Sequence, residues 1–275
     1  MSDSDRPGGT TSPLTLLAVD IDGTLLTWGG ELFASAERAV RRALADPRVE
    51  LVLATGRSVH STVQVSRRIG IEKGLAVCAN GSATIRLDPS LPDGWEITEL
   101  VTFDPAPAIA AIRRRLPQAR LAAEDLGGGF RVTAPFPPGE LDGAVRLVGF
   151  DEMAAEPVTR LVLRDTELTL EELRELVEEI KLRDVTYSVG WTGWVDLNPP
   201  GVSKASALEA IRRQLGVEPG RTVAIGDGGN DIEMLRWAGR GVAMGGARWD
   251  VVAAADEQTG LIHEDGLARV IDSLL

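Results

Sequence analysis

Residues 14–24 read LTLLAVDIDGT, an apolar run that ends in two carboxylates, Asp20 and Asp22. A continuous apolar run of this length predicts a parallel β-strand that is buried on both faces and carries polar groups at its carboxyl end. Two other runs repeat the pattern, since Val49–Ala54 leads into Thr-Gly-Arg and Thr222–Ile225 leads into Gly-Asp-Gly-Gly-Asn-Asp. Helical patterns lie between the strands, so the sequence predicts an α/β fold with a Rossmann-like core on a parallel sheet.

The pattern changes after about residue 84 and returns after residue 200. The intervening stretch is richer in Pro and Gly, and its alternating segments indicate shorter, half-exposed strands around helices. We expect an inserted α+β domain at 86–189, a core made of 14–85 and 190–275, and a short disordered tail at 1–13. The other expected elements are helices at Ala34–Ala45, Ser58–Ile69, Thr169–Leu182, Ser203–Leu215, Asn230–Trp237, Trp249–Ala255 and Gly266–Leu275, strands at Leu75–Ala79 and Gly241–Met244, and a hairpin at Tyr187–Leu197 with its turn near 190–193.

The composition is that of an ordinary folded protein and argues against two classes of partner. Of the 275 residues, 44% are hydrophobic and 25% charged, which speaks against disorder, collagen and coiled coil. The net charge of −12 repels nucleic-acid backbones and anionic lipid, and the longest basic run is only Arg113–Arg115. Because no apolar stretch approaches the ~20 residues of a membrane helix, we expect neither nucleic acid nor a membrane as partner.

Cysteine usage and the first residues bear on the compartment. Cys78 is the only cysteine, which excludes an internal disulfide and fits a reducing environment. The polar stretch 1–13 lacks the apolar segment of a signal peptide. We therefore expect a cytoplasmic protein, either a monomer or a homodimer.

The paired carboxylates at the end of the first strand point to a metal. Burying Asp20 and Asp22 as two like charges is costly unless a cation or a proton compensates them. A hard divalent cation solves this problem, because carboxylate oxygens suit Mg²⁺. A strand-end Asp that caps the following turn would account for one of the two, but not for both with Gly-Thr behind them.

Two further positions carry weaker signals. Thr55 and Gly56 place a hydroxyl beside an unobstructed amide, which makes a small anion cradle, although Thr-Gly turns are common. Lys204 begins a predicted helix, where a cation opposes the helix dipole. Taken alone, each favours the simpler interpretation, a turn in the first case and a surface lysine in the second.

The stretch 226–231, GDGGND, follows a buried strand and supplies hard-metal ligands and exposed amides. An Asn or Asp that caps the next helix would explain Asn230 or Asp231 but does not require Asp227. All four motifs lie at the carboxyl ends of predicted parallel strands or in the adjoining loops, so an open sheet brings them to one edge. Such a set binds a metal and a phosphate.

The order of these motifs resembles a known superfamily. DIDGT at 20–24, TGR at 55–57, Lys204 and GDGGND at 226–231 match the four signature motifs of the haloacid dehalogenase-like (HAD) phosphatases. The insertion after the third strand, with Asn80-Gly81 and Pro200-Gly-Val-Ser-Lys204, is similar to the Cof-type branch and its large α+β (C2B-like) cap. The resemblance covers most of the core, whereas the cap matches by position and size.

The resemblance implies catalytic roles for three residues. Asp20 would be the nucleophile that becomes an aspartyl phosphate, and nearby cations would offset its repulsion from the phosphate. Asp22 would protonate the leaving oxygen and then deprotonate the attacking water. Lys204 would balance the charge on Asp20 and the phosphate.

The resemblance also implies a metal site and a phosphate site. Mg²⁺ would lie among Asp20, the backbone carbonyl of Asp22, and Asp227, with Asp231 coordinating directly or through water. The phosphate-binding residues would be Thr55, the Gly56 amide and Asn230.

The sequence thus predicts a Mg²⁺-dependent phosphomonoester hydrolase acting on a small phosphorylated metabolite, with sugar phosphates slightly favoured and the cap setting specificity. Two alternatives stay open at this point. Phosphomannomutase-like phosphomutases look like this architecture and share both aspartates of the first motif, and a bisphosphate requirement would separate the two activities. A non-catalytic phosphometabolite-binding protein would bind a ligand without releasing phosphate.

Overall fold

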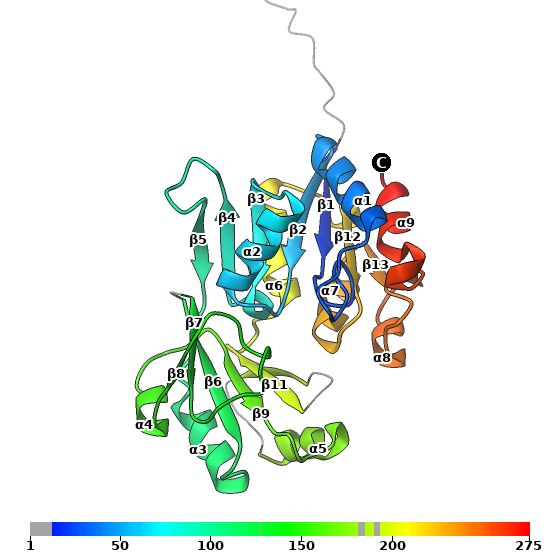
Figure 1. Cartoon of the computed structure of the whole chain (residues 1–275). Helices are drawn as coiled ribbons and strands as arrows, with labels where there is room; N and C mark the ends of the chain where they lie inside the picture. Colours follow the sequence, from blue (N-terminus) through cyan, green and yellow to red (C-terminus); the bar gives the residue numbers. More distant parts are fainter. Residues whose placement is uncertain (1–12, 127, 181–184, 190–192) are drawn as a thin grey trace, which may run out of the picture.

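The chain is described by a computed structural model that covers residues 13–126, 128–180, 185–189 and 193–275. Its strands form two separate sheets, one of eight strands and one of six (Figure 1). The domain built on the eight-stranded sheet contains both ends of the described chain, and the six-stranded sheet lies beyond the carboxyl ends of its parallel strands. Among the described helices, none is long and apolar enough to span a membrane. The expected tail lies almost wholly outside the described residues.

The eight-stranded sheet has the order β14-β13-β12-β1-β2-β3-β4-β5. Strands β14 to β3 are parallel, and β4 and β5 return antiparallel at the edge. The central strand, β1, comes from the first apolar run of the sequence and pairs with β2 on one side and with β12 on the other. The strands are β1 (Thr15–Val19), β2 (Val49–Ala54), β3 (Gly74–Cys78), β4 (Ala83–Leu87), β5 (Trp95–Leu100), β12 (Thr222–Gly226), β13 (Arg240–Ala243) and β14 (Glu257–Gln258).

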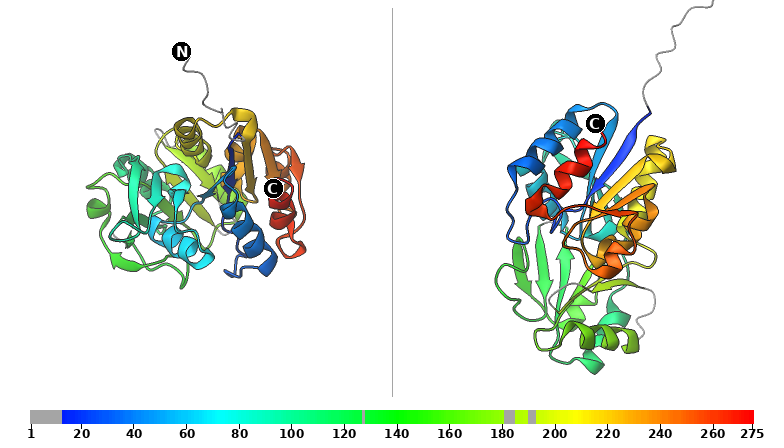
Figure 2. Two further views of the ribbon diagram at one scale, coloured as in Figure 1. Left: turned by 90° about the horizontal axis from the view of Figure 1, so that it is seen from above. Right: turned by 90° about the vertical axis from the view of Figure 1, so that its right-hand side faces the viewer.

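Helices cover both faces of this sheet, as the end-on view in Figure 2 shows. Alternate residues of β1 serve the two faces: Leu17 and Val19 join one buried cluster, and Leu16 and Ala18 join the other. A strand buried on both faces has no polar side, which is why its sequence is continuously apolar. The first cluster includes α1 (Ala34–Ala45), α2 (Val59–Ile69) and α9 (Gly266–Asp272), and the second includes α6 (Lys204–Leu215), α7 (Ile232–Trp237) and α8 (Trp249–Val252).

The six-stranded sheet has the order β10-β11-β9-β6-β7-β8 and is antiparallel except for the β7–β8 pair. Its three helices pack on one face, and the opposite face carries a small apolar cluster around Phe130 and Val162. The elements are β6 (Arg120–Asp125), β7 (Gly129–Val132), β8 (Ala144–Leu147), β9 (Leu161–Arg164), β10 (Thr186–Val189) and β11 (Trp194–Asn198), with α3 (Ala106–Arg115), α4 (Phe150–Met153) and α5 (Leu170–Ile180). Short 3₁₀ turns are η1 (Ala79–Gly81), η2 (Pro219–Arg221), η3 (Gly229–Asp231) and η4 (Ile262–Glu264).

The α/β core is confirmed, but the sheets divide the chain at other points than 86 and 189. β5 follows β4 as an antiparallel hairpin and belongs to the eight-stranded sheet. β11 belongs to the six-stranded sheet, where it pairs with β9 and β10. The expected boundaries therefore separate β5 from the sheet that it joins, and β11 from its partners β9 and β10, because local alternation predicts a strand but does not name its partner. The expected turn at 190–193 and residues 181–182 of the expected helix Thr169–Leu182 lie largely outside the described residues.

Candidate active site

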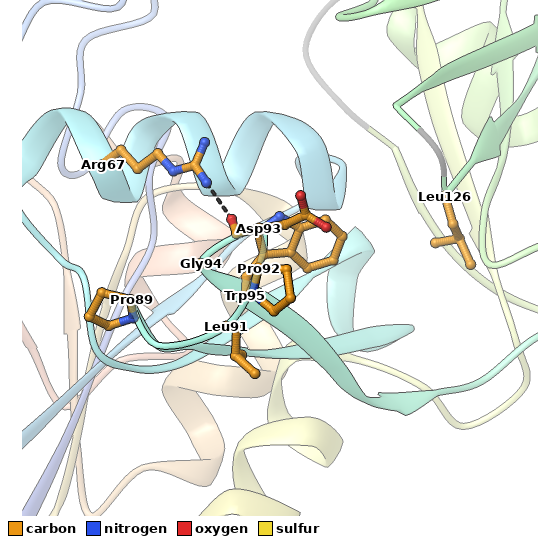
Figure 3. Close-up of a pocket in the computed structure, with 8 residues that line it drawn as sticks. All are labelled: Arg67, Pro89, Leu91, Pro92, Asp93, Gly94, Trp95 and Leu126. Carbon is orange, nitrogen blue, oxygen red and sulfur yellow. Dashed lines mark hydrogen bonds between the residues drawn. The ribbon is translucent and has the colours of Figure 1, made fainter.

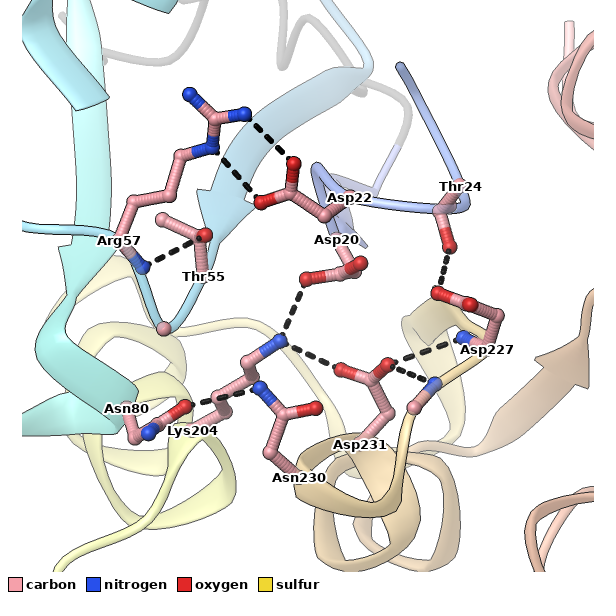
Figure 4. Close-up of polar contacts among 12 residues, drawn as sticks. Asp20, Asp22, Thr24, Thr55, Arg57, Asn80, Lys204, Asp227, Asn230 and Asp231 are labelled. Carbon is pink, nitrogen blue, oxygen red and sulfur yellow. Dashed lines mark hydrogen bonds and ion pairs between the residues drawn. The ribbon is translucent and has the colours of Figure 1, made fainter. Parts of the chain in front are cut away.

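The four motifs meet at one edge of the eight-stranded sheet, next to the six-stranded sheet (Figure 4). Asp20 directly follows β1, Thr55 follows β2 and Asp227 follows β12, and these three strands are neighbours in the order β12-β1-β2. Parallel strands end on the same side, so residues more than 200 positions apart come together there. This juxtaposition is the one that the strand pattern predicted.

Three buried carboxylates form the centre of the site. Asp20, Asp227 and Asp231 each offer an oxygen, and these atoms lie within 4.8 Å of one another. Desolvation raises the pKa of Asp227 to about 7, helped by the charge of Asp231. Desolvation likewise raises the pKa of Asp20 well above its ordinary value, with Asp231 again contributing. Clustered acids that resist ionisation in this way are the donor set that a hard divalent cation compensates.

Lys204 is buried at this centre and does not lie on the surface. Its Nζ donates to Asp20 Oδ1 and to Asp231 Oδ1, at 2.6 Å in each case. Burial lowers the pKa of Lys204, but attraction by the two carboxylates outweighs burial and leaves this pKa above its ordinary value. The ammonium therefore stays charged and belongs to the site.

Local backbone geometry fixes where Lys204 and Asp231 stand. Ser203 caps α6 by accepting from the Ser206 amide, so that Lys204 is the first residue of the helix. Asp231 uses its other oxygen to accept from the amides of Asp227 and Gly228, at 3.0 and 2.9 Å. Asp231 thus organises its own loop while it also binds the lysine.

Two glycines of the motifs leave room for these carboxylates. Gly23 has φ +86°, and a Cβ there would lie 2.2 Å from Asp227 Oδ2. A Cβ on Gly226 would lie 2.4 Å from the Asp231 Cγ. Both positions therefore require glycine, because any side chain would displace a carboxylate of the cluster.

The loop after β2 presents polar groups beside the carboxylates. Thr55 Oγ1 accepts from the Arg57 amide at 3.1 Å, which leaves its hydroxyl proton available. Among the hydrogen bonds of the described residues, none uses the Gly56 amide. Asn230 donates to Asn80 Oδ1 at 3.0 Å, and Asn80 takes a left-handed conformation with φ 54°. The loop can therefore hold a tetrahedral anion.

Asp22 lies apart from the carboxylate cluster. Its two oxygens accept from Arg57 Nε and Nη2 at 2.7 and 2.6 Å, a bidentate ion pair at the wall of the cavity (Figure 4). Arg57 belongs to the Thr-Gly-Arg motif, but the sequence alone assigned it no role. Its position at the end of a strand, beside another motif, could have marked it as a site residue.

A cavity of about 700 Å³ opens onto these residues from between the two sheets. The core contributes residues of the motifs, among them Asp20, Thr55 and Asp227, together with Trp28 and Arg248. The six-stranded sheet and its loops contribute the opposite wall, made of Phe130, Gly139, Glu140, Leu141, Asp142, Arg160, Ser188, Trp194 and Asp196. Lys204 and Asp231 lie beneath the cavity floor, fully buried.

Sequence reasoning missed Arg160 and Asp196, which lie close to the loop after β2. Arg160 stands in the stretch TRLVLR, and an arginine that opens so apolar a strand was a usable signal. Asp196 offered none, because a carboxylate in a half-exposed hairpin is ordinary. Trp194 contacts Phe136 edge-on and also lines the cavity. Trp191 lies outside the described residues.

A second cavity of about 710 Å³ lies near the β4–β5 hairpin (Figure 3). Its wall holds one cation, Arg67, which donates to the Asp93 carbonyl, and one carboxylate, that of Asp93. The remaining lining residues are Pro89, Leu91, Pro92, Gly94, Trp95 and Leu126. This wall lacks the grouped carboxylates and cations of the site between the sheets.

The fold and the site define a class of enzyme, an α/β phosphatase with an inserted cap. The chain belongs to the haloacid dehalogenase-like hydrolase family, whose profile matches residues 17–90 and 147–271. It is a Cof-type phosphatase of that family and acts on phosphorylated substrates.

Three similar proteins illustrate the range of the family. The 5-amino-6-(5-phospho-D-ribitylamino)uracil phosphatase YcsE of Bacillus subtilis is 29% identical over 94% of each chain. A phosphoglycolate phosphatase of Methanothermobacter thermautotrophicus is 28% identical over 93% of this chain and 96% of its own. The structure of the HAD subclass IIB sugar phosphatase BT4131 superposes with a TM-score of 0.78 at 26% identity, covering 94% of this chain and 98% of that one.

Proposed function

We propose that this protein is a Mg²⁺-dependent phosphomonoester hydrolase that works through an aspartyl phosphate on Asp20. The observation that carries the proposal is the meeting of three buried carboxylates, Lys204 and the Thr55 loop at the floor of one cavity. A phosphate dianion that approaches this floor needs cations to offset its repulsion from Asp20.

The donor set fits a divalent metal. Asp20, Asp227 and Asp231 supply only carboxylate oxygens, and burial, together with repulsion among them, raises the pKa of Asp20 and of Asp227. These three residues, with the backbone carbonyl of Asp22, would hold Mg²⁺. When bound, the ion supplies positive charge that offsets the charge of the phosphoryl group.

Asp20 and Asp22 carry out the covalent chemistry in this proposal. A carboxylate oxygen of Asp20 forms a bond to phosphorus while the bond from phosphorus to the leaving oxygen breaks, and that oxygen takes a proton from Asp22. Water then attacks phosphorus as ionised Asp22 accepts its proton, releasing phosphate and restoring Asp20. The bidentate pair with Arg57 holds the carboxyl group of Asp22 in a fixed orientation at the cavity wall.

The remaining residues bind and orient the phosphoryl group. Lys204 orients Asp20, since it donates directly to the nucleophile, and its charge opposes the rise in the pKa of Asp20 that burial causes. The Thr55 hydroxyl and the Gly56 amide hold phosphoryl oxygens, and Asn230 positions the phosphate from the opposite side.

The cavity wall supports a hydroxyl-rich leaving group, in keeping with the preference for sugar phosphates. Asp142, Ser188 and Asp196 offer acceptors, and Trp194 offers an aromatic surface. The cap arginine of this wall, Arg160, already faces carboxylates. An uncharged polyol suits such a wall better than a carboxylate or a second phosphate does.

We also propose a cytoplasmic location. Cys78 is a free, buried thiol, and burial raises its pKa to about 12, so it stays protonated. A protein whose single cysteine serves for packing has no need of an oxidising compartment.

The experiment is phosphate release from a panel of sugar phosphates, nucleotides, phosphoglycolate and phosphorylated cofactors, with Mg²⁺ or with EDTA. Asp20→Asn is the control, since it removes the nucleophile but keeps the shape, and its release should fall below about one thousandth of wild type. Metal-dependent release that this variant loses supports the proposal. Isomer formation that depends on a sugar bisphosphate would instead identify a mutase, and tight binding without release would identify a binding protein.

A further inference from the structure

Two buried charged side chains of the six-stranded sheet form hydrogen bonds with the backbone of the loop after β2 and the start of α2. Arg160 Nη1 donates to the carbonyl oxygen of Gly56, and Glu124 Oε1 accepts from the Val59 amide at 3.1 Å. Gly56 lies in the loop after β2, and Val59 is the first residue of α2. These two bonds therefore fall on the same short segment of the core, three residues apart.

Arg160 and Glu124 are placed for this by strand alternation. Glu124 lies in β6, Arg160 immediately precedes β9, and β6 and β9 are hydrogen-bonded neighbours. Leu161 and Ala123, next to them in sequence, belong to the cluster beneath the cap helices. Because side chains alternate along a strand, Arg160 and Glu124 fall on the opposite face, which is turned toward the core.

A buried ion pair between two sheets is energetically unfavourable, because both charges must be desolvated. Both residues are 5% exposed, and Arg160 Nη2 lies 3.7 Å from Glu124 Oε2. Within the described residues, Arg160 Nε and Glu124 Oε2 have no hydrogen-bond partner. Well-packed apolar side chains often stabilise a protein as much as a buried ion pair does. The contribution of these two charges therefore lies in their directional hydrogen bonds to the loop.

The Gly56 carbonyl is connected to the site through one rigid unit. That carbonyl and the Arg57 amide belong to the same planar peptide group. The Arg57 amide donates to Thr55 Oγ1 at 3.1 Å. The hydrogen bond from Arg160 to the Gly56 carbonyl oxygen therefore fixes the Arg57 amide and, through that amide, the orientation of the Thr55 hydroxyl.

We propose that Arg160, held by Glu124, is a positioning residue through which the cap orients the Thr55 hydroxyl toward the phosphoryl group. This inference rests on the proposed function, in which Thr55 binds that group. It gives the cap a part in phosphate binding that does not depend on which leaving group is bound. Arg160 acts through the Gly56–Arg57 peptide and need not touch the substrate.

Arg160→Met tests this role against Arg131→Met as a matched control. Arg131 is a buried arginine of the same sheet whose ion pairs, with Asp125 and Glu156, stay within the cap. The probe is inorganic phosphate, measured as a competitive inhibitor of phosphate release. Loss of a charge-assisted hydrogen bond is expected to weaken phosphate inhibition about tenfold in Arg160→Met, and to leave it within about twofold in Arg131→Met.

A second readout does not require activity. Amide hydrogen exchange at Arg57 and Val59 should be faster in Arg160→Met than in wild type, and unchanged in Arg131→Met. Equal inhibition and equal exchange in the two variants would overturn the proposal. If wild type releases no phosphate from any compound, the proposed function fails, whereas the exchange data still decide whether Arg160 anchors the loop. Should Arg160→Met not fold, Glu124→Gln keeps the shape and should move both readouts in the same direction.

Discussion

At the scale of single residues, Lys204 is the clearest case in which burial changes the role that a side chain can have. An exposed lysine that begins a helix would be slightly unfavourable and dispensable. This one is fully buried between two carboxylates, so its charge is part of the electrostatic balance of the site. The sequence identified the residue through its place in the motif order, but its surroundings come from three separate segments of the chain.

Lys204→Met should therefore affect both activity and stability. Removing one partner of a buried ion pair costs about 3–5 kcal/mol of unfolding free energy, because Asp20 and Asp231 lose the cation between them. We expect that loss in urea denaturation with EDTA present, together with a severe loss of phosphate release. Lys73→Met, at an exposed position, should leave both unchanged. Wild-type rates in Lys204→Met would contradict the role assigned to Lys204.

At the scale of elements, the start of helix α6 sets the position of the lysine. Ser203 and Ser206 form a reciprocal capping box, in which each side chain accepts from the other residue's amide. The cap fixes which residue is first in the helix and hence the direction in which Lys204 leaves the backbone. Serine at this position was visible in the sequence, and the expected helix Ser203–Leu215 agrees with the observed one once Ser203 is counted as its cap.

Ser203→Ala is expected to lower the unfolding free energy by about 1 kcal/mol, the usual cost of losing an N-cap. Urea denaturation measures this change, and the dependence on urea concentration should stay constant if only stability is altered. Ser203→Asp keeps an acceptor at the cap and should remain close to wild type. An alanine variant as stable as the aspartate variant would show that the side-chain cap contributes nothing.

Sheet pairing is the feature of the elements that the sequence predicted least well. The alternation in 86–198 indicated short strands, and short strands are present. The expected hairpin at Tyr187–Leu197 is present as the β10–β11 pair. The boundaries expected at 86 and 189 differ from the sheets, since β5 pairs with β4 of the core and β11 pairs with β9 of the cap. Register and partner follow from which faces are buried in the assembled molecule, and a single strand sequence does not contain that information.

At the scale of the whole molecule, metal binding by the carboxylate cluster would be coupled to folding. The three donors come from two segments more than 200 residues apart, so they converge only in the folded chain. A cation that binds the folded state alone stabilises that state by mass action. It also relieves the repulsion that raises the pKa of Asp20 and of Asp227.

Mg²⁺ should accordingly raise the melting temperature, and EDTA should reverse the rise. At about 100 times its Kd, the ion adds about 2.7 kcal/mol to the unfolding free energy. Calorimetry with and without Mg²⁺ measures the shift, and Asp227→Asn, which removes one donor, should reduce it. A melting temperature that stays the same at saturating Mg²⁺ would argue against a metal site at these carboxylates.

The sequence by itself determined the class of fold and the order of the motifs, and it predicted eight candidate site residues. Continuous apolar runs mark strands buried on both faces, and parallel strands bring their carboxyl ends to one edge. Only the tertiary structure decided that Lys204 is buried, that Asp22 pairs with Arg57, and that Arg160 and Glu124 of the cap bind the backbone of the loop after β2. The reason is physical: local patterns report the burial of a strand or helix, whereas a side-chain contact between distant segments depends on how the two sheets pack together.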